Sequence, residues 1–305
     1  MIEMKKYMDV VRLGHKSTAG VLNIGDNIVI QEKIDGANAS FRLSNNSMKV
    51  EAFSRNTKLD EFNNLGGFFQ WVQDNIDPSN LQKNCIYFGE WTNPHKIKYN
   101  PEYTKTFFLF DIYNEQTQEY VDYNVVKSEA ESIELTVVPV FYEGKYRSFE
   151  HLATFVGKSK LGGKLGDLNT GEGIVVKNTK YKDGFGSQRF VKMVTDSFRE
   201  VQKQKAPKDP SQQSVEMIFV NECLTLARVE KLLYKLVDET LLEEQFGIED
   251  MGLILKHLGE RSYEDMMKEE SDSLENYEEK QIKKCIGKKL PGIVKQILAT
   301  RERAA

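Results

Sequence analysis

The spacing of apolar residues changes near residue 206, and this change divides the chain into two parts. Upstream, short β-branched runs are separated by turn residues, which is the pattern of strands. Downstream, apolar residues recur every three or four positions, as they do on one face of a helix. The segment between them is polar and contains Pro207 and Pro210, so it is expected to be a linker. The sequence therefore predicts a strand-rich domain over residues 1–205, a linker over 206–213 and a helical domain over 214–305.

The first domain is predicted to hold several short strands. Asp35-Gly36 and Asn45-Asn46-Ser47 are turn signals between runs rich in strand-forming residues. Because short turns join antiparallel strands, these runs are expected to form an antiparallel meander over residues 27–33, 37–43 and 48–53. Later strands are predicted at residues 86–91, 106–113, 136–142, 173–177 and 189–194, and helices at 62–76 and 149–156.

Composition narrows the class of protein. Of the 305 residues 40% are hydrophobic, no apolar run approaches the length of a membrane span, and the three cysteines form neither a metal-ligand pattern nor a disulfide framework. We therefore expect a cytoplasmic monomer that does not bind membranes. The net charge is −4, and residues 206–305 carry about 15 Lys and Arg against about 20 Asp and Glu. Any surface for nucleic acid must therefore be a local patch.

Lys33 begins the pattern Lys-x-Asp-Gly, which chance alone supplies in several per cent of chains of this length. One interpretation is structural: a lysine at the end of a strand, before a hairpin turn. The other is chemical, because a lysine amine with a lowered pKa is a nucleophile. The four residues alone do not decide between these interpretations.

Five further segments follow Lys33 in order. They are Ser54-Arg55-Asn56, Phe88-Gly89-Glu90-Trp91, Phe107 to Ile112, Glu172 to Lys177, and Phe190-Val191-Lys192-Met193. Each alone has a structural interpretation, as a core phenylalanine or as charges on a strand. Their order and spacing over residues 28–200 resembles the covalent nucleotidyltransferases, which include polynucleotide ligases and mRNA capping enzymes. The resemblance implies an α+β fold: a nucleotidyltransferase (ATP-grasp-like ligase) domain of antiparallel sheets flanked by helices, followed here by a small all-α domain.

The resemblance implies that Lys33 attacks the α-phosphorus of ATP, expels pyrophosphate and becomes joined to AMP. An ordinary lysine is almost fully protonated at pH 7, so nearby cations and partial burial must lower the pKa of Lys33. Lys177 and Lys192, together with bound Mg²⁺ or Mn²⁺, are the predicted cations, and they would also stabilise charge on phosphorus. Glu172 is the predicted metal ligand. The predicted catalytic residues are thus Lys33, Glu172, Lys177 and Lys192.

The resemblance also implies a nucleotide site. Phe110 would stack on the purine, Glu90 would accept a hydrogen bond from the ribose 2′-hydroxyl, and Glu32 would face the adenine. Arg55 would bind a phosphate through its planar guanidinium, and Asn38 would line the same pocket. The predicted nucleotide-binding set is completed by Ile34, Lys177 and Lys192.

The region after the last segment distinguishes among these enzymes. Most DNA ligases and capping enzymes continue with a small β-barrel, whereas residues 214–305 are predicted to be helical and resemble the C-terminal domain of the RNA ligase 2 family. That resemblance implies an ATP-dependent RNA ligase that serves in RNA repair and seals 3′-hydroxyl and 5′-phosphate ends in nicked or bridged duplexes. The reaction would pass through lysyl-AMP and an adenylated 5′ end. Lys96 and Lys98 are candidates either for contact with the RNA strand or for a solvated loop.

One position departs from the family pattern. The last segment usually carries a second lysine, but this chain has Val194 there, and Lys180, Lys182 or Arg189 are the candidates to replace it. Three other functions compete with the RNA ligase hypothesis. They are a DNA ligase with an unusual C-terminal domain, a GTP-using capping enzyme, and a nucleic-acid-binding module that no longer reacts.

Overall fold

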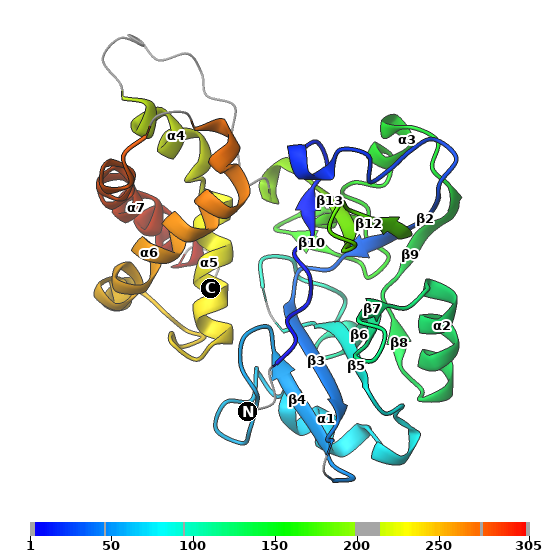
Figure 1. The fold of residues 1–305 in the computed structure, drawn as a ribbon. Coiled ribbons are helices and arrows are strands. Elements are labelled where there is room, and N and C mark those ends of the chain that lie inside the picture. The colour runs from blue at the N-terminus through cyan, green and yellow to red at the C-terminus, as the bar shows by residue number, and fades with distance from the viewer. Residues whose placement is uncertain (1–3, 46, 94, 199–213, 275–276, 303–305) are drawn as a thin grey trace. The chain divides into compact units, whose positions relative to one another are not determined.

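The computed structural model describes residues 4–45, 47–93, 95–198, 214–274 and 277–302 (Figure 1). The chain forms two compact units, Met1–Thr195 and Asp196–Ala305. The predicted linker at residues 206–213 lies outside the described residues, and the predicted domain limits stay a prediction.

Unit 1 is built on two main sheets. The first has the strand order β1 (Val11–Arg12), β13 (Gln188–Val194), β12 (Gly173–Lys182), β2 (Asn27–Lys33) and β9 (Val140–Lys145). The second has the order β4 (Val50–Ser54), β3 (Ala37–Leu43), β5 (Cys85–Trp91), β6 (Phe107–Asn114) and β7 (Glu119–Tyr120), with β8 (Thr136–Val137) beside β6. A separate hairpin joins β10 (Lys164–Leu165) and β11 (Leu168–Asn169). Pairing is antiparallel throughout these strands except between β1 and β13 and between β6 and β8.

Helices cover the two sheets. Apolar residues of α1 (Phe68–Asn75) and α2 (Tyr123–Ser132) pack with the second sheet, while Leu152 of α3 (Phe149–Ala153) packs with the first. Single 3₁₀ turns of unit 1 occur at Lys16–Thr18, Pro78–Asn80 and Pro101–Tyr103, and a further one at Asp196–Phe198 begins unit 2. The α+β architecture predicted from the sequence is confirmed by this arrangement.

The predicted meander is wrong at its first turn. Strands β3 and β4 pair as expected, but β2 lies in the first sheet, between β12 and β9, and the chain crosses from one sheet to the other at Ile34–Gly36. Gly36 passes so close to β5 that an added Cβ would lie 2.6 Å from the Trp91 carbonyl oxygen. The predicted turn residues therefore separate two sheets instead of closing a hairpin.

Other predicted elements differ at their ends. The helix predicted from residue 62 begins only at Phe68, because Gly66 and Gly67 adopt positive φ values and Phe62 is 94% exposed. The strand predicted over residues 136–142 is divided into β8 and β9 around Pro139, whose ring nitrogen cannot donate a ladder hydrogen bond. Helix α2 was not predicted, since its apolar positions are few.

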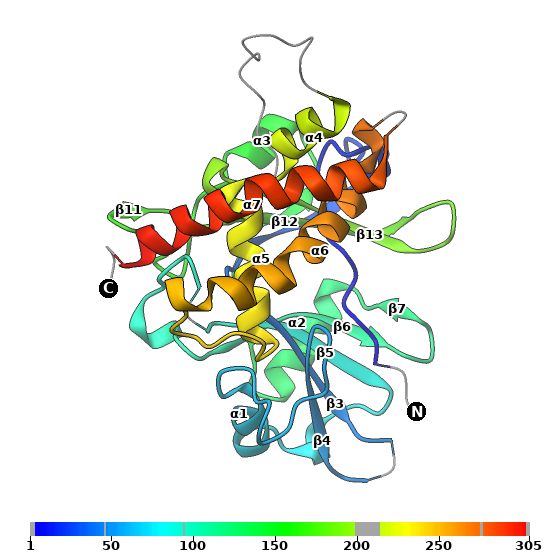
Figure 2. The ribbon, with the colours of Figure 1, turned by 90° about the vertical axis from the view of Figure 1, so that its left-hand side faces the viewer.

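Unit 2 is helical, as predicted. Its helices are α4 (Val215–Cys223), α5 (Leu226–Asp238), α6 (Met251–Glu270) and α7 (Glu279–Glu302), with 3₁₀ turns at Ile248–Asp250 and Ser271–Ser273. Ser214 and Thr225 are the N-caps of α4 and α5 and accept hydrogen bonds from the Met217 and Arg228 N–H groups, which fixes where each helix begins. Figure 2 shows α7 crossing α5 and α6, and leucine and isoleucine side chains from all three share one core. Among the described residues no helix is long and apolar enough to span a bilayer.

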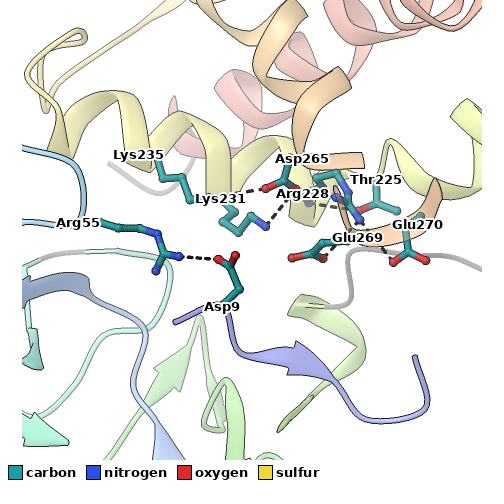
Figure 3. Close-up of polar contacts among 9 residues, drawn as sticks. All are labelled: Asp9, Arg55, Thr225, Arg228, Lys231, Lys235, Asp265, Glu269 and Glu270. Carbon is teal, nitrogen blue, oxygen red and sulfur yellow. Dashed lines mark hydrogen bonds and ion pairs between the residues drawn. The ribbon is translucent and has the colours of Figure 1, made fainter. Parts of the chain in front are cut away.

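A buried arginine connects α5 to α6 inside unit 2 (Figure 3). The Arg228 side chain is fully buried, and its guanidinium lies 2.6 Å from Asp265 and 3.8 Å from both Glu269 and Glu270. Lys235 approaches the same Asp265 at 3.6 Å but is 37% exposed. The guanidinium therefore compensates carboxylates that would otherwise lie next to an apolar core.

Replacing Arg228 by alanine is expected to destabilise unit 2 by about 3–5 kcal/mol, because it removes a fully buried side chain and takes the guanidinium away from the buried Glu270 carboxylate. The matched change Lys235→Ala should cost less than about 1 kcal/mol, since that ammonium is solvated. Urea titrations followed by helical circular dichroism measure both. Equal losses in the two variants would contradict the buried role of Arg228.

Candidate active site around Lys33

Lys33 is the last residue of β2, and its position is set by the register with β12. Gly173 lies directly opposite Lys33, so Glu172 is placed beside the amine. The Lys33 Nζ donates to Glu172 Oε2 at 2.8 Å, and the two side chains are 26% and 11% exposed. The pair is thus largely screened from water, yet the amine remains accessible to a ligand.

Glu90 approaches the same amine from the second sheet. It lies on β5 opposite Asn38 of β3, and its carboxylate accepts a hydrogen bond from the Gly36 N–H at 3.2 Å. Burial raises the pKa of Glu90 to about 8, with Lys33 opposing the rise and Glu172 adding to it. The crossing at Gly36 therefore brings carboxylates from β5 and the start of β12 to one lysine.

The electrostatic environment of Lys33 differs from the expected one. Burial lowers the pKa of Lys33 and Lys192 assists, but Glu172 and Glu90 outweigh them, so the net pKa is raised. The prediction that nearby cations lower it is wrong for the protein without its ligands. Lys33 therefore stays an ammonium ion unless another cation binds Glu172 and Glu90 and weakens their effect on its pKa.

Asp35, the third residue of the Lys-x-Asp-Gly pattern, fixes the loop that follows β5. Its carboxylate accepts from the Ile97 N–H at 2.7 Å and lies 3.6 Å from His95, while its own N–H donates to the Tyr99 hydroxyl. Burial raises the pKa of Asp35, but His95 and the Ile97 N–H outweigh it and the net pKa is lowered. This anchoring role was not predicted, because its partners are distant in sequence.

Glu32 and Ile34 flank Lys33 and are both buried. The Glu32 carboxylate accepts hydrogen bonds from the Ser159 hydroxyl at 2.6 Å and the Lys160 N–H at 2.8 Å. Burial raises the pKa of Glu32 against these bonds. Ile34 packs with Leu161 in a small apolar cluster that Phe110 borders. These contacts attach the segment around residue 160 to the segment of the nucleophile, and no sequence signal identified Ser159.

Lys177 lies apart from Lys33. It stands four residues along β12 from Gly173, about 13 Å at ordinary strand geometry. Its Nζ donates to Asp111 Oδ2 and to the Phe110 carbonyl oxygen, both at 2.7 Å, and it is 2% exposed. The Tyr7 hydroxyl donates to the same carboxylate. The expectation that Lys177 lies beside the nucleophile is therefore wrong. Its ammonium group instead holds the backbone of Phe110 in place.

Lys192 lies on the face of the first sheet that carries Lys33. It is opposite Val175 on β12, two positions from Val194, which is opposite Gly173. Two of the three expected substitutes for a second lysine, Lys182 and Arg189, are engaged elsewhere. Lys182 pairs with Glu119 and Arg189 pairs with Asp183, at the far end of the β12–β13 hairpin.

Arg55, the predicted phosphate ligand, follows β4. Its guanidinium lies 2.6 Å from the carboxylate of Asp9, and both side chains are partly exposed (Figure 3). A carboxylate is the side-chain group most similar in charge and geometry to a phosphate oxygen pair. Asp9 thus marks an anion position at Arg55.

The described side chains offer too few ligands to hold a metal ion by themselves. Among the described residues no group of three His, Cys, Asp or Glu side chains could hold a metal ion. Magnesium usually takes one or two carboxylates and completes its shell with water and substrate phosphates. The buried Glu172 and the half-buried Glu90, both with raised pKa values, fit that limited role because a cation would relieve their mutual repulsion.

One protein family matches this sequence. The family model described as RNA ligase matches residues 26–194, which is more than half of the chain. No curated protein matches the sequence. Similar solved structures include Naegleria gruberi RNA ligase with PPi at 17% identity and a TM-score of 0.46. They also include mutants of that ligase with ATP and Mn at 16% identity and 0.47, and with AMP and Mn at 17% and 0.47. Each match covers 64% of this chain and 57% of the other chain.

The buried pair of Lys177 and Asp111 can be tested by stability. The change Lys177→Met should destabilise unit 1 by about 3–5 kcal/mol, because Asp111 is left buried without its counter-charge. Adding Asp111→Leu should recover about half of that loss or more, since both charges are then absent. Thermal and urea denaturation measure this. Unchanged stability in Lys177→Met would show that the lysine serves only a ligand.

Proposed function

The chain belongs to the RNA ligase family, and we propose that it is an ATP-dependent ligase that joins RNA 3′-hydroxyl and 5′-phosphate ends through a lysyl-AMP intermediate. The observation that carries this proposal is the position of Lys33. Its amine is accessible at a strand end and paired with Glu172 at 2.8 Å, and Glu90 and Lys192 are close enough to shift its pKa. A purely structural lysine before a hairpin turn is disfavoured, because no hairpin forms at Asp35-Gly36.

In the first step the Lys33 nitrogen attacks the α-phosphorus of ATP. A P–N bond forms, the bond from the α-phosphorus to the bridging oxygen breaks, and pyrophosphate leaves. The lysine must first lose its proton, which Glu172 is positioned to hold or pass on. Mg²⁺ or Mn²⁺ held by Glu172 and substrate phosphates would supply positive charge there. Lys192 adds a fixed cation that favours the neutral amine.

Residues around Lys33 have complementary roles in this proposal. Phe110 provides an aromatic face for the purine, and its carbonyl is held in place by Lys177. Glu90 receives the ribose hydroxyl, and Ile34 supplies an apolar wall. Arg55 and Asn38 bind phosphate.

Two further transfers complete the reaction. The RNA 5′-phosphate attacks the phosphorus of lysyl-AMP, so the P–N bond breaks and a 5′-5′ pyrophosphate linkage forms. The RNA 3′-hydroxyl then attacks the 5′-phosphorus, a phosphodiester forms, and AMP leaves. Nicked or bridged duplex RNA is the proposed substrate, since these substrates hold the two ends in line.

Labelling with α-labelled ATP tests the first step. The protein should acquire one acid-labile AMP in the presence of Mg²⁺ or Mn²⁺, and Lys33→Ala should acquire none because no other amine occupies its place. Lys33→Arg is the matched control, since it keeps the ion pair with Glu172 but is not a nucleophile. Label retained on either variant would remove Lys33 from this role, and a GTP-only adduct would indicate a capping enzyme instead.

Matched nicked duplexes test the substrate. We expect sealing when the 3′-hydroxyl side is RNA, with a rate at least about tenfold lower when that strand is DNA. Single-turnover assays with the preadenylated 5′ end isolate this step from ATP binding. Sealing of only the deoxyribose strand would make the protein a DNA ligase.

A further inference from the structure

A hollow of about 660 Å³ lies beside the Lys33 site, and its lining is basic. It is formed by the segment around residue 160 and by the β10–β11 hairpin, with Asn100 at its border. Lys158, Lys160 and Lys164 line it, and its lining contains no Asp or Glu. The hollow does not include Lys33, Glu90 or Phe110, so it is separate from the proposed nucleotide site.

A fourth lysine adds to this charge. Lys98 pairs with Lys164 in an isolated antiparallel bridge, in which each backbone N–H donates to the other carbonyl at 2.9 Å. Residues directly opposite in such a pair present their side chains on the same face, and like charges there are destabilising. Both side chains are exposed. Within the described parts of the chain, neither of them forms an ion pair with a carboxylate. Repulsion of this kind is relieved when an anion binds between the two ammonium groups.

The loop that lines the hollow is fixed in place because its glycines pack closely against neighbouring segments. Gly162 has a φ of 71°, and a Cβ there would lie 2.3 Å from Asn100 Oδ1. A Cβ on Gly163 would lie 2.5 Å from the Thr170 carbonyl oxygen. Ser159 accepts hydrogen bonds from the Leu161 and Gly163 N–H groups. The loop is therefore a packed structure that holds its lysines around one space.

The hollow shares its framework with the Lys33 site. Ser159 and Lys160 hold the Glu32 carboxylate, and Thr170 lines the hollow two residues before Glu172. Along β2, Glu32 and Lys33 point to opposite faces. The Lys33 amine therefore lies on one face of β2, whereas the hollow is attached to the Glu32 carboxylate on the other.

We propose that Lys98, Lys158 and Lys164 bind the phosphodiester backbone of the RNA substrate in this hollow, beside the adenylated lysine. This proposal rests on the proposed RNA ligase function. Exposed amines on a fixed loop suit a regular row of phosphates, because such contacts position a strand without reading its sequence. Lys160 has a different role, since its Nζ donates to the Val140 carbonyl oxygen.

The test uses the full chain with Lys158→Ala and Lys164→Ala combined. The matched control combines Lys49→Ala and Lys145→Ala. Both control lysines are exposed and lie at the ends of strands remote from Lys33; Lys145 pairs with Asn27, about 20 Å along β2 from Lys33. Binding of a fluorescent nicked RNA duplex is measured by anisotropy from 50 to 200 mM salt. ATP-dependent labelling of Lys33 is measured on the same preparations.

Each lost phosphate contact should reduce the slope of log K against log salt by about 0.7–0.9, so the hollow variant should lose about 1.5. Its Kd at the lowest salt should rise by about tenfold or more, while its labelling by ATP remains that of the wild type and the control variant binds RNA normally. This pattern would support the proposal, and normal labelling shows that the variant is folded.

Three results would overturn the proposal. An RNA affinity and salt slope of the hollow variant equal to those of the wild type would show that the lysines only solvate the loop. Slower labelling with a raised KM for ATP, at unchanged RNA affinity, would assign the hollow to the triphosphate or pyrophosphate. Loss of affinity equal for the two pairs would show only an effect of net charge. Failure of the wild type to become labelled would instead reject the proposed ligase function, whatever the RNA binding shows.

Discussion

The pairing of Lys33 with Glu172 is the interaction on which the candidate site depends. The two residues are 139 positions apart, and they meet because β12 pairs with β2 in the register that sets Gly173 opposite Lys33. A slip of one residue would turn Lys33 to the other face of the sheet. The alternation of buried residues prevents that slip, since Ile28 and Ile30 pack with the α3 side while Val29 packs with the second sheet. Core packing therefore fixes the reacting group.

The sheet crossing at Ile34–Gly36 then determines what surrounds this pair. A hairpin at this point would have placed β3 next to β2 and kept the Glu90 carboxylate in another part of the sheet. Because the chain changes sheets, β5 supplies Glu90 from one side and β12 supplies Glu172 from the other. The sequence predicted a turn there and its neighbouring strands, since those depend on local composition. It did not predict the partner of β2, because periodicity encodes which face is buried and not which strand is adjacent.

The same limit explains which site residues were predictable. Lys33, Glu90 and Glu172 occur in segments whose order carried a family resemblance, and the structure brings these three together. Lys177 was in such a segment too, yet its ammonium contacts Asp111 and the Phe110 carbonyl oxygen. Tyr7 and Ser159 could not be predicted, because each acts through a partner more than 100 residues away. The order of the motifs identified which segments form the site. It did not identify the partner of each side chain, because partners depend on how the elements pack.

Val194, which stands where the family pattern has a second lysine, explains why few cations surround the Lys33 amine. It stands in a row with Gly173 and Lys33, and Gly173 has no side chain to separate them. A lysine at position 194 would extend over Gly173 toward the Lys33 amine, from a backbone about 10 Å away. The valine leaves Lys192 as the cation that opposes protonation of Lys33, against the carboxylates of Glu172 and Glu90. The carboxylates prevail, so the pKa of Lys33 is raised. Formation of the neutral amine must then depend more on charge brought by the bound nucleotide and its metal than on the protein's own lysines.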